Sequence, residues 1–297
     1  MAHALHSVTG ADLLQGYSIE VMPRTVAKIA DFKALLPAGT RVYIAHIDGT
    51  PIDDMVSTAR RIARDGFEVM PHFPARSIPD RTTLTDWIAR YQGEAGVDQA
   101  LVLAGGNAKP VGCFTSSIEL LQCGAFHAAG FKRLHVAGHP EGNRDIDPDG
   151  GSAQIDAALR WKQEHARETG VEMAIVTQFL FDAEKAADWI AALRRDGIDL
   201  PVHLGLAGPA KLQTLIKFAI ACGVGPSLSV LKKRARDLTK LLLPFEPTEM
   251  LDGLAGAARH SPAATPEQLH LFPLGGIQTC VDWANRQGAG HLRQVAG

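Results

Sequence analysis

Short apolar runs alternate along the chain with longer stretches in which apolar residues recur at helical spacing. This alternation is typical of repeated βα units on a parallel sheet. The predicted strands are Tyr17–Met22, Arg41–Ile47, Phe67–His72, Gln99–Ala104, Arg133–Ala137, Glu172–Phe179, Val202–Leu206 and Gln268–Pro273. The predicted helices are Asp53–Asp65, Leu84–Glu94, Ser116–Ala129, Ala153–Glu168, Ala183–Asp196, Ala210–Cys222, Ser227–Leu243 and Pro247–Arg259.

Eight strands separated by helices, in a chain of 297 residues, favour a closed barrel over an open doubly wound sheet. The helices Ser227–Leu243 and Pro247–Arg259 are then additions before the last strand. No linker rich in Pro, Gly or Ser and no shift in composition marks a second domain. The sequence therefore predicts an α/β fold, a (β/α)8 TIM barrel with extra helices before the last strand, as one domain over residues 1–297.

Composition narrows the classes of partner. With 30 Lys+Arg against 32 Asp+Glu, the net charge of −2 favours neither nucleic acid nor an anionic membrane surface. The basic run Lys232–Arg236 is expected to be a solvated helix face. No apolar run approaches the roughly 20 residues that span a bilayer, and the four cysteines form no CxxC pair. We expect a cytoplasmic protein with reduced thiols that binds a small molecule, and a homo-oligomer is compatible with the sequence.

Chemistry in such barrels lies at the C-terminal ends of the strands and in the loops that follow them. Polar residues that close the predicted strands are the candidates. They are Glu20, His46, Asp48, His72, Gly105–Asn107, His139, Glu141, Gln178, Asp182 and His203.

Glu20 lies among apolar residues inside the first predicted strand. The alternative to a functional role is a carboxylate that faces solvent. Helices cover the outside of parallel barrel strands and side chains fill the inside, so a functional position is favoured. Burial would raise the pKa of this carboxyl and suit it to general acid catalysis near neutrality.

Other candidates are weighed in the same way. The segment Ala104–Asn107 can bring backbone amides to a ligand, but it matches neither phosphate-binding glycine pattern, and a plain turn is the alternative. The amide of Gln178 needs a partner when buried, which a heteroaromatic ligand or a structural hydrogen bond would supply. The histidines show neither HxH nor HExxH spacing, so no metal site is predicted.

Five segments carry a resemblance to a known family. Ser18–Pro23, Pro71–Phe73, His139–Glu141, Ser152–Asp156 and Thr177–Asp182 resemble, in this order, the motifs of the methylenetetrahydrofolate reductase family. The resemblance implies an oxidoreductase of one-carbon metabolism that has an FAD at the C-terminal face of the barrel. In that family the flavin takes hydride from NADH or NADPH and passes it to 5,10-methylenetetrahydrofolate, which becomes 5-methyltetrahydrofolate.

The resemblance also implies roles for substrate-contacting residues. Glu20 occupies the place of the family's general acid toward N10 of the folate. Gln178 matches the amide that contacts the pterin and lies beside the nicotinamide. Asn107, Leu212 and Phe272 are likewise assigned to the substrate.

For the flavin, the resemblance implies His72, Asp156 and Lys162, the last near the pyrophosphate. His46 and His139 stand where the family commonly has Tyr. The strand-four segment, which the family usually reads as Leu-Arg-Gly-Asp, supplies Ala104, Gly105, Gly106 and Asn107 in this chain.

The departures from the family pattern leave alternatives. Ala104 and Asn107 replace an Arg and an Asp, so a flavin loses a charge-assisted partner. The segment Phe272–Gly276 lacks the Tyr and Arg that the family often has there. The sequence favours a reductase that uses FAD and NAD(P)H. It leaves open direct hydride transfer without flavin, net oxidation of 5-methyltetrahydrofolate, and a non-catalytic barrel that binds folate or flavin.

Overall fold

Eight parallel strands close into a barrel in the order β1 to β8. The computed structural model describes residues 8–223, 231 and 244–289. The strands are β1 (Ser18–Val21), β2 (Arg41–Ile44), β3 (Glu68–Pro74), β4 (Gln99–Leu103), β5 (Arg133–Gly138), β6 (Ile175–Leu180), β7 (Val202–Ala207) and β8 (Gln268–Phe272). All eight predicted strands and the (β/α)8 barrel are confirmed.

Contacts between residues group the chain into two compact units. The first unit is Ser18–Gly138 with Ala153–Val176, and it contains β1 to β5. The second unit is Met1–Tyr17, His139–Ser152 and Thr177–Gly297, and it contains most of β6 with β7 and β8. The expectation of a single domain stays a prediction.

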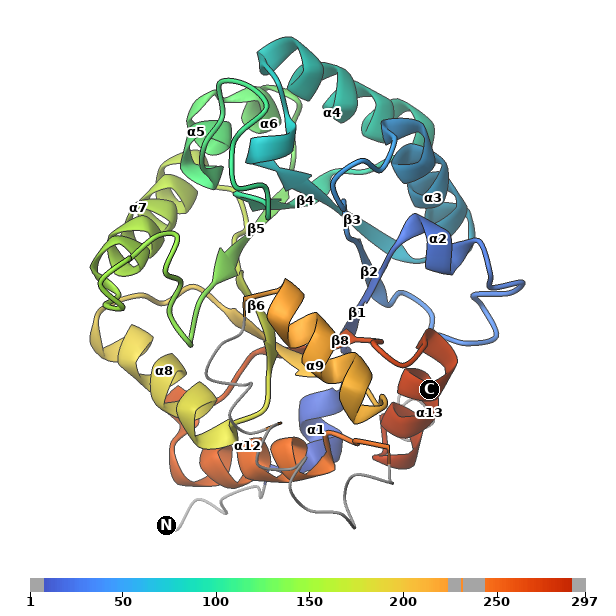
Figure 1. The fold of residues 1–297 in the computed structure, drawn as a ribbon, viewed down its shortest axis with the longest axis vertical. Coiled ribbons are helices and arrows are strands. Elements are labelled where there is room, and N and C mark those ends of the chain that lie inside the picture. The colour runs from blue at the N-terminus through green and yellow to red at the C-terminus, as the bar shows by residue number, and fades with distance from the viewer. Residues whose placement is uncertain (1–7, 224–230, 232–243, 290–297) are drawn as a thin grey trace. The chain divides into compact units, whose positions relative to one another are not determined.

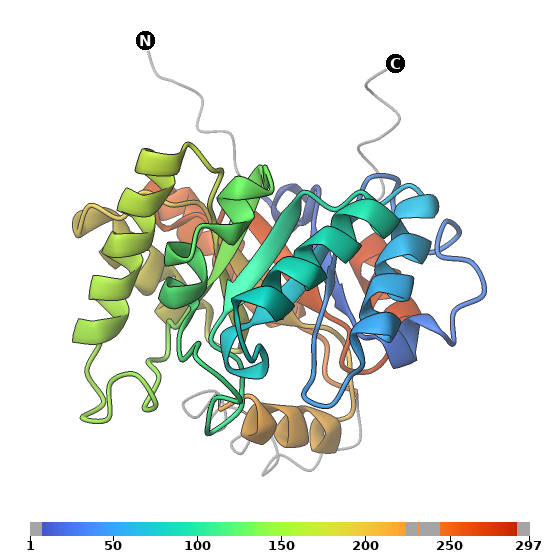
Figure 2. The same cartoon turned by 90° about the horizontal axis from the view of Figure 1, so that it is seen from above.

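The helices of the first unit follow their strands, with α3 and α4 packed side by side (Figures 1 and 2). The helical elements are α2 (Pro23–Val26), α3 (Ile52–Arg64), η1 (Ala75–Ser77), α4 (Arg81–Ala95), α5 (Ser117–Gln122), α6 (Ala125–Ala128) and α7 (Ala153–Thr169). The single helix predicted over Ser116–Ala129 is wrong. Gly124 has a φ of 70°, a left-handed conformation that ends α5 and starts α6.

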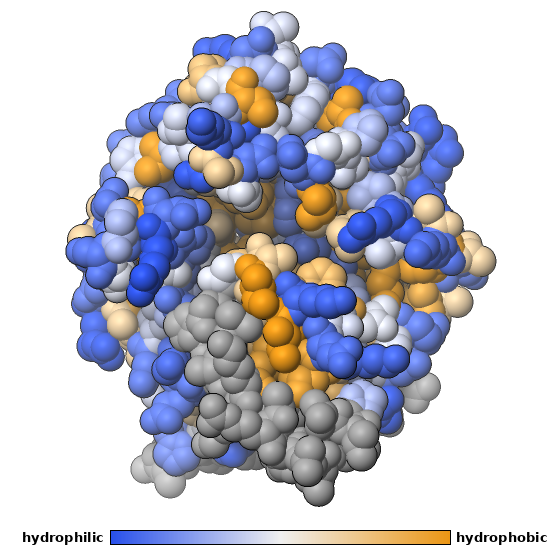
Figure 3. All heavy atoms as spheres, in the orientation of Figure 1, coloured by the Kyte–Doolittle hydropathy of each residue, from blue (hydrophilic) through white to orange (hydrophobic). Residues whose placement is uncertain are grey.

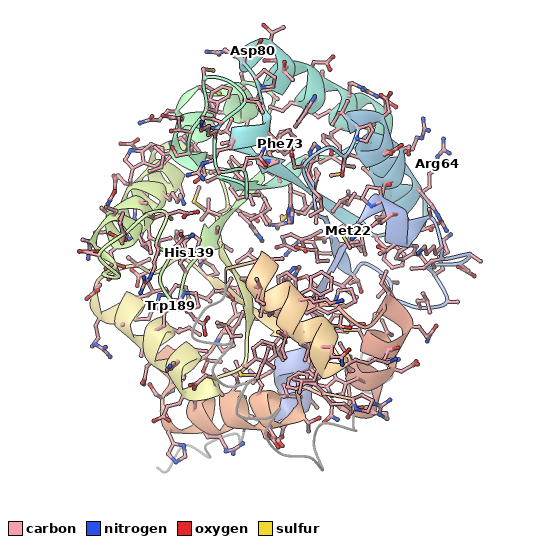
Figure 4. The ribbon with its side chains drawn as sticks, viewed as in Figure 1. Met22, Arg64, Phe73, Asp80, His139 and Trp189 are labelled. Carbon is pink, nitrogen blue, oxygen red and sulfur yellow. The ribbon has the colours of Figure 1, made fainter. Side chains whose placement is uncertain are left out.

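The outward face of β3 packs against helices. Phe73, labelled in Figure 4, meets Tyr91 at 5.4 Å and Phe126 at 5.1 Å between ring centroids. The inward faces of the first unit instead hold a small apolar cluster of Tyr43, Met70, Leu101 and Val176. Because side chains alternate between the two faces of a strand, this register fixes which polar residues can enter the barrel.

The N-terminal ends of the first unit's strands carry paired charges. Arg41 and Glu68 form an ion pair of 2.9 Å between β2 and β3. Arg133 on β5 donates to Gln99 on β4 at 3.2 Å and pairs with Glu172. The charges at this end of the strands are therefore held in ion pairs and hydrogen bonds.

In the second unit, α9 packs on the C-terminal ends of the strands. Its Leu212 and Leu215 share an apolar cluster with Phe179 of β6 and Phe272 of β8. Figure 3 shows apolar side chains gathered over α9, where Ile220 is 64% exposed. The helical elements are α1 (Gly10–Leu14), α8 (Ala183–Arg195), α9 (Leu212–Ala221), α12 (Thr248–His260), η2 (Pro262–Ala264) and α13 (Ile277–Arg286).

The addition expected before the last strand is present as α12, which packs on α8. The other expected helix, Ser227–Leu243, lies outside the described residues except for Leu231. Helices α1, α2 and α13 were not predicted. In the described part of the chain, no helix combines the length and apolar character that a membrane span requires.

Candidate active site

Glu20 and His72 lie together at the C-terminal ends of β1 and β3. Glu20 stands between Ile19 and Val21, which are buried on the opposite face of β1. Its Oε2 is 3.4 Å from Nε2 of His72, and the two side chains are 21% and 10% exposed. Burial raises the pKa of the Glu20 carboxyl, and the charge of His72 opposes that rise. The raised pKa favours a protonated carboxyl, the form that acts as a general acid.

A second polar pair lies in the same unit. The hydroxyl of Tyr43 on β2 is 2.6 Å from Nδ1 of His135 on β5. Burial raises the pKa of Tyr43, so its phenol is neutral. The Tyr43 ring meets the edge of the His72 ring at 6.4 Å between centroids. The interior thus carries two polar pairs. Tyr43, which belongs to the second pair, was not among the site residues predicted from the sequence.

Asn107 is held by side chains from two other loops. Its Nδ2 donates to Oδ1 of Asp48 at 3.2 Å and to Oγ of Ser77 at 3.3 Å. Arg76 donates from Nη1 to the Asn107 carbonyl and from Nε to the Thr115 carbonyl, each at 3.1 Å. The sequence identified Asp48 but missed Arg76 and Ser77. The polar turn directly after β3 is the signal that could have found them.

The glycine-rich segment after β4 is tied to the chain that follows β3. The amide of Arg76 donates to the Ala104 carbonyl at 2.9 Å, and the amide of Cys113 donates to the Pro79 carbonyl at 3.0 Å. At Gly112 an added Cβ would lie 1.8 Å from the carbonyl oxygen of Pro79. The close approach of these two backbones therefore requires glycine at position 112.

The glycines of the predicted cradle have different surroundings. Gly105 has a φ of 92°, and a Cβ there would lie 2.9 Å from Cβ of Pro74. Gly106 has open space where a Cβ would stand. Gly105 thus has a backbone reason to be glycine, and only Gly106 leaves room beside the backbone for a ligand.

His46 lies in the loop after β2. Its Nε2 is 3.0 Å from the Thr50 carbonyl, and its ring packs on Trp87 with centroids 5.0 Å apart. Burial lowers the pKa of His46, which favours the neutral imidazole. The neutral Nε2 then carries the proton that it donates to Thr50.

Asp156 and Lys162 lie at different positions along α7 and differ in burial. Asp156 is half-buried in the first turn, and Lys162 follows six residues, or about 9 Å, further along the helix. Lys162 shares the buried face of α7 with Ile155 and Leu159 and is 6% exposed. Burial lowers its pKa to about 8. No hydrogen bond or ion pair joins its amine to any residue that the structure describes.

In the second unit, Gln178 lies near the C-terminal end of β6 and is half-buried. Its Oε1 accepts a hydrogen bond from the Phe179 amide at 3.2 Å. A Cβ at Gly205 would lie 2.5 Å from the Gln178 carbonyl oxygen and 2.8 Å from Cε2 of Phe272. Gly205 therefore lets the Phe272 ring pack closely on β7. Leu212 is buried in the same cluster as Phe272.

Three candidates lie elsewhere. His139, labelled in Figure 4, is half-buried directly after β5. Asp182 caps α8 by accepting from the Lys185 amide at 3.1 Å. Placing His203 at the end of its strand is wrong, because it is the second residue of β7 and pairs with Gln268, the first residue of β8. Its ring lies 3.5 Å from Glu267 at the N-terminal end.

The first unit therefore brings Glu20 together with His72, and Asn107 together with Asp48. The second unit brings Gln178 and Phe272 together around Gly205. Among the described residues, no group of three or more His, Cys, Asp or Glu side chains is arranged to hold a metal ion.

The chain matches no protein-family model. An uncharacterized protein from Clostridium thermocellum that binds two copies of 5-methyl-5,6,7,8-tetrahydrofolic acid has a similar structure, with a TM-score of 0.53, 11% identity and coverage of 92% of this chain and 96% of that one. DHPS from Yersinia pestis, solved with a pterine-sulfa conjugate, gives a TM-score of 0.46 and 12% identity, with coverage of 92% of each chain. The first likeness supports the barrel fold.

Proposed function

We propose that this protein transfers hydride between NAD(P)H and the folate pair 5,10-methylenetetrahydrofolate and 5-methyltetrahydrofolate, with Glu20 as the general acid. The observation that carries the proposal is the carboxyl of Glu20, whose pKa burial raises, at the C-terminal end of a barrel strand. The five motifs shared in order with the methylenetetrahydrofolate reductase family support it. The fold neighbour from Clostridium thermocellum, which binds a reduced folate, is consistent with it.

The chemistry needs one proton and one hydride. Protonation of N10 breaks its bond to the methylene carbon and leaves a 5-iminium cation. Hydride from the nicotinamide then adds to that carbon and gives the methyl group. Burial raises the pKa of the Glu20 carboxyl and so favours its protonated form, which places Glu20 to supply the proton.

The residues assigned to FAD by resemblance do not fit that cofactor well. Ala104 brings no charge to it, and the amide of Asn107 is taken by Asp48 and Ser77. Lys162 lies on the packed face of α7, about 14 Å along the helix from its first residue. Neither Ala104 nor Lys162 therefore offers the pyrophosphate the charged partner expected there. These observations favour direct hydride transfer from nicotinamide to folate, so no step is assigned to a flavin.

The decisive experiment measures NADH oxidation by flavin-stripped protein, with and without methylenetetrahydrofolate and with and without added FAD. NADPH is tested in parallel. Folate-dependent turnover without FAD supports direct transfer. Turnover only with FAD supports the flavin mechanism instead. No turnover under any condition favours a non-catalytic barrel that binds folate or flavin.

The role of Glu20 is tested by Glu20→Gln. This variant is expected to bind folate as wild type does but to turn over about 10² times more slowly, the lower scale of general acid catalysis. Glu184→Gln, at an exposed position on α8, is the matched control. Equal turnover in Glu20→Gln and wild type would remove Glu20 from the mechanism.

The flavin alternative has its own variant. Ala104→Arg places a guanidinium at the end of β4 and is expected to strengthen FAD binding by charge-assisted hydrogen bonding. Flavin fluorescence titration measures the Kd. An unchanged or weaker Kd would show that the strand-four charge does not limit FAD affinity.

A further inference from the structure

Two charged side chains of the first unit lie on either side of Asn107 without pairing with each other. The Asn107 side chain donates to Oδ1 of Asp48 at 3.2 Å, and the Asn107 carbonyl accepts from Nη1 of Arg76 at 3.1 Å. Neither charge forms an ion pair with any residue that the structure describes. Both residues follow strands at the end of the barrel where ligands bind, and the proposed reaction gives neither of them a role.

The surrounding contacts fix these two groups and leave part of each for a ligand. Asn107 is held in place, because its Nδ2 also donates to Oγ of Ser77 at 3.3 Å. Nε of Arg76 donates to the Thr115 carbonyl at 3.1 Å, and its Nη2 has no hydrogen bond within the described part of the chain. Asp48 is exposed, and the same holds for its Oδ2. Each charged group is therefore held at one atom and available at another.

The backbone beside both loops leaves room for a ligand. Gly49 follows Asp48, and Gly106 precedes Asn107. At both glycines, no atom beyond the chain neighbours lies within 4 Å of the place where a Cβ would stand. A ligand can therefore approach the backbone of both loops closely. Such a site suits a ligand that has hydroxyl donors at one end and an anion next to them.

The adenosine ribose and the pyrophosphate of a dinucleotide have this chemistry. A carboxylate accepts hydrogen bonds from ribose hydroxyls, and a guanidinium pairs with phosphate oxygens. A single CH2–O link joins ribose to pyrophosphate, and a single residue separates Asp48 from Arg76. We propose that Asp48 binds the adenosine ribose of NADH, that Arg76 binds its pyrophosphate, and that Asp48 selects NADH over NADPH. This inference rests on the proposed use of a nicotinamide coenzyme and names the coenzyme and its binding residues.

The selection follows from charge. NADPH carries a phosphate on the 2′-oxygen of the adenosine ribose, which removes one hydroxyl donor and brings negative charge to the carboxylate. Among the described residues, no cation is paired with Asp48 to offset that repulsion. Like charges in contact disfavour binding, so the wild-type protein should bind NADH at least about tenfold more tightly than NADPH.

The test of Asp48 measures the binding of NADH and NADPH to folate-free protein by titration calorimetry. Asp48→Asn keeps the size of the side chain and removes its charge. We expect it to bind NADH about tenfold more weakly, the lower scale for a lost hydrogen bond to a charged group, and to bring the two Kd values within about threefold of each other. Asp86→Asn, exposed on α4, is the matched control and should keep both Kd values.

Three results would overturn the role of Asp48. They are an unchanged ratio of the NADH and NADPH Kd values in Asp48→Asn, equal affinity of the wild-type protein for the two coenzymes, and absence of NADH binding by the wild-type protein.

Arg76 is tested through the salt dependence of binding. NADH binding by the wild-type protein should weaken as ionic strength rises, because salt screens the pairing of guanidinium with phosphate. Arg76→Met should bind both coenzymes about tenfold more weakly and with a smaller salt dependence. Loosening of the loop alone would leave the wild-type salt dependence, and that result overturns the role of the guanidinium. Arg64→Met, exposed on α3, is the control and should change neither quantity.

FAD has the same ribose and pyrophosphate, so the variants are also titrated with FAD. Weaker FAD binding with unchanged NADH binding would overturn the assignment to NADH. These titrations need no turnover and therefore separate the site from the reaction. The expected binding changes without folate-dependent turnover would refute the proposed reaction and support the site. Turnover with NADH but none of the expected binding changes would refute the site and leave the reaction standing.

Discussion

The buried amine of Lys162 offers a quantitative test of the structure. Its pKa is lowered from 10.5 to about 8 because folding removes the ammonium from water without an ion pair among the described residues. At about 1.36 kcal/mol for each pKa unit, the charged side chain costs the folded state about 3 kcal/mol at neutral pH. We expect Lys162→Met, which keeps an unbranched side chain one atom shorter, to raise the free energy of unfolding by up to that amount at pH 7.

The same shift predicts a pH dependence. Because the folded-state pKa is the lower one, the unfolded chain binds more protons between about pH 8 and 10.5. The destabilisation is complete below pH 8 and is relieved as pH rises toward 10.5. The advantage of Lys162→Met over wild type should therefore shrink from pH 7 to pH 10 in urea denaturation. Lys217→Met, exposed on α9, is the control and should show no such trend.

Two outcomes would refute this reasoning. An advantage of Lys162→Met that is equal at pH 7 and pH 10 would show that the ammonium is not desolvated. A loss of stability in the variant would show that the amine has a favourable partner. The same variant also tests the role implied by resemblance, because replacing a lysine that binds the flavin pyrophosphate would weaken FAD binding.

Further predictions concern packing, the loop after β4 and pH. Gly205→Ala should destabilise the protein by about 1–3 kcal/mol in urea denaturation, since its Cβ would lie 2.5 Å from a carbonyl oxygen. The control Gly256→Ala, within α12, should be neutral or stabilising by up to about 1 kcal/mol in the same assay. Arg76→Met removes two hydrogen bonds to loop carbonyls and should speed hydrogen exchange in segment 104–116, and unchanged exchange would contradict the anchoring role. Turnover in the folate-reducing direction should be lost as pH rises through the raised pKa of Glu20, and a rate that rises there would exclude it as the acid.

The strands could be predicted because each is a short apolar run between polar turns. Their ends were less certain. Glu172, for example, forms only an isolated bridge with Arg133 before β6 begins at Ile175. Helix α13 was missed although Ile277, Cys280, Val281 and Ala284 recur at helical spacing and are buried. That signal was available in the sequence. The break at Gly124 was not, because an internal glycine is also compatible with a continuous helix.

The candidate site was only partly predictable for a different reason. Glu20 could be found because a carboxylate inside a barrel strand is unusual. Its partner in space could not, because pairing depends on strand register, and residues such as Tyr43 and His135 lie 92 positions apart in sequence. The predicted placement of His203 failed for the same reason, since the true ends of β7 decide which side chain reaches the C-terminal face.

The polar layers of the first unit account for the properties of Glu20. At the N-terminal ends of the strands, Arg41 is paired with Glu68, and its charge also acts on Tyr43 in the next layer. Tyr43, a member of the apolar cluster, then meets the buried His135 at hydrogen-bond distance. Next to this layer, burial raises the pKa of the Glu20 carboxyl, and the charge of His72 opposes that rise. The burial that stabilises this unit is the same burial that raises the pKa of the acid.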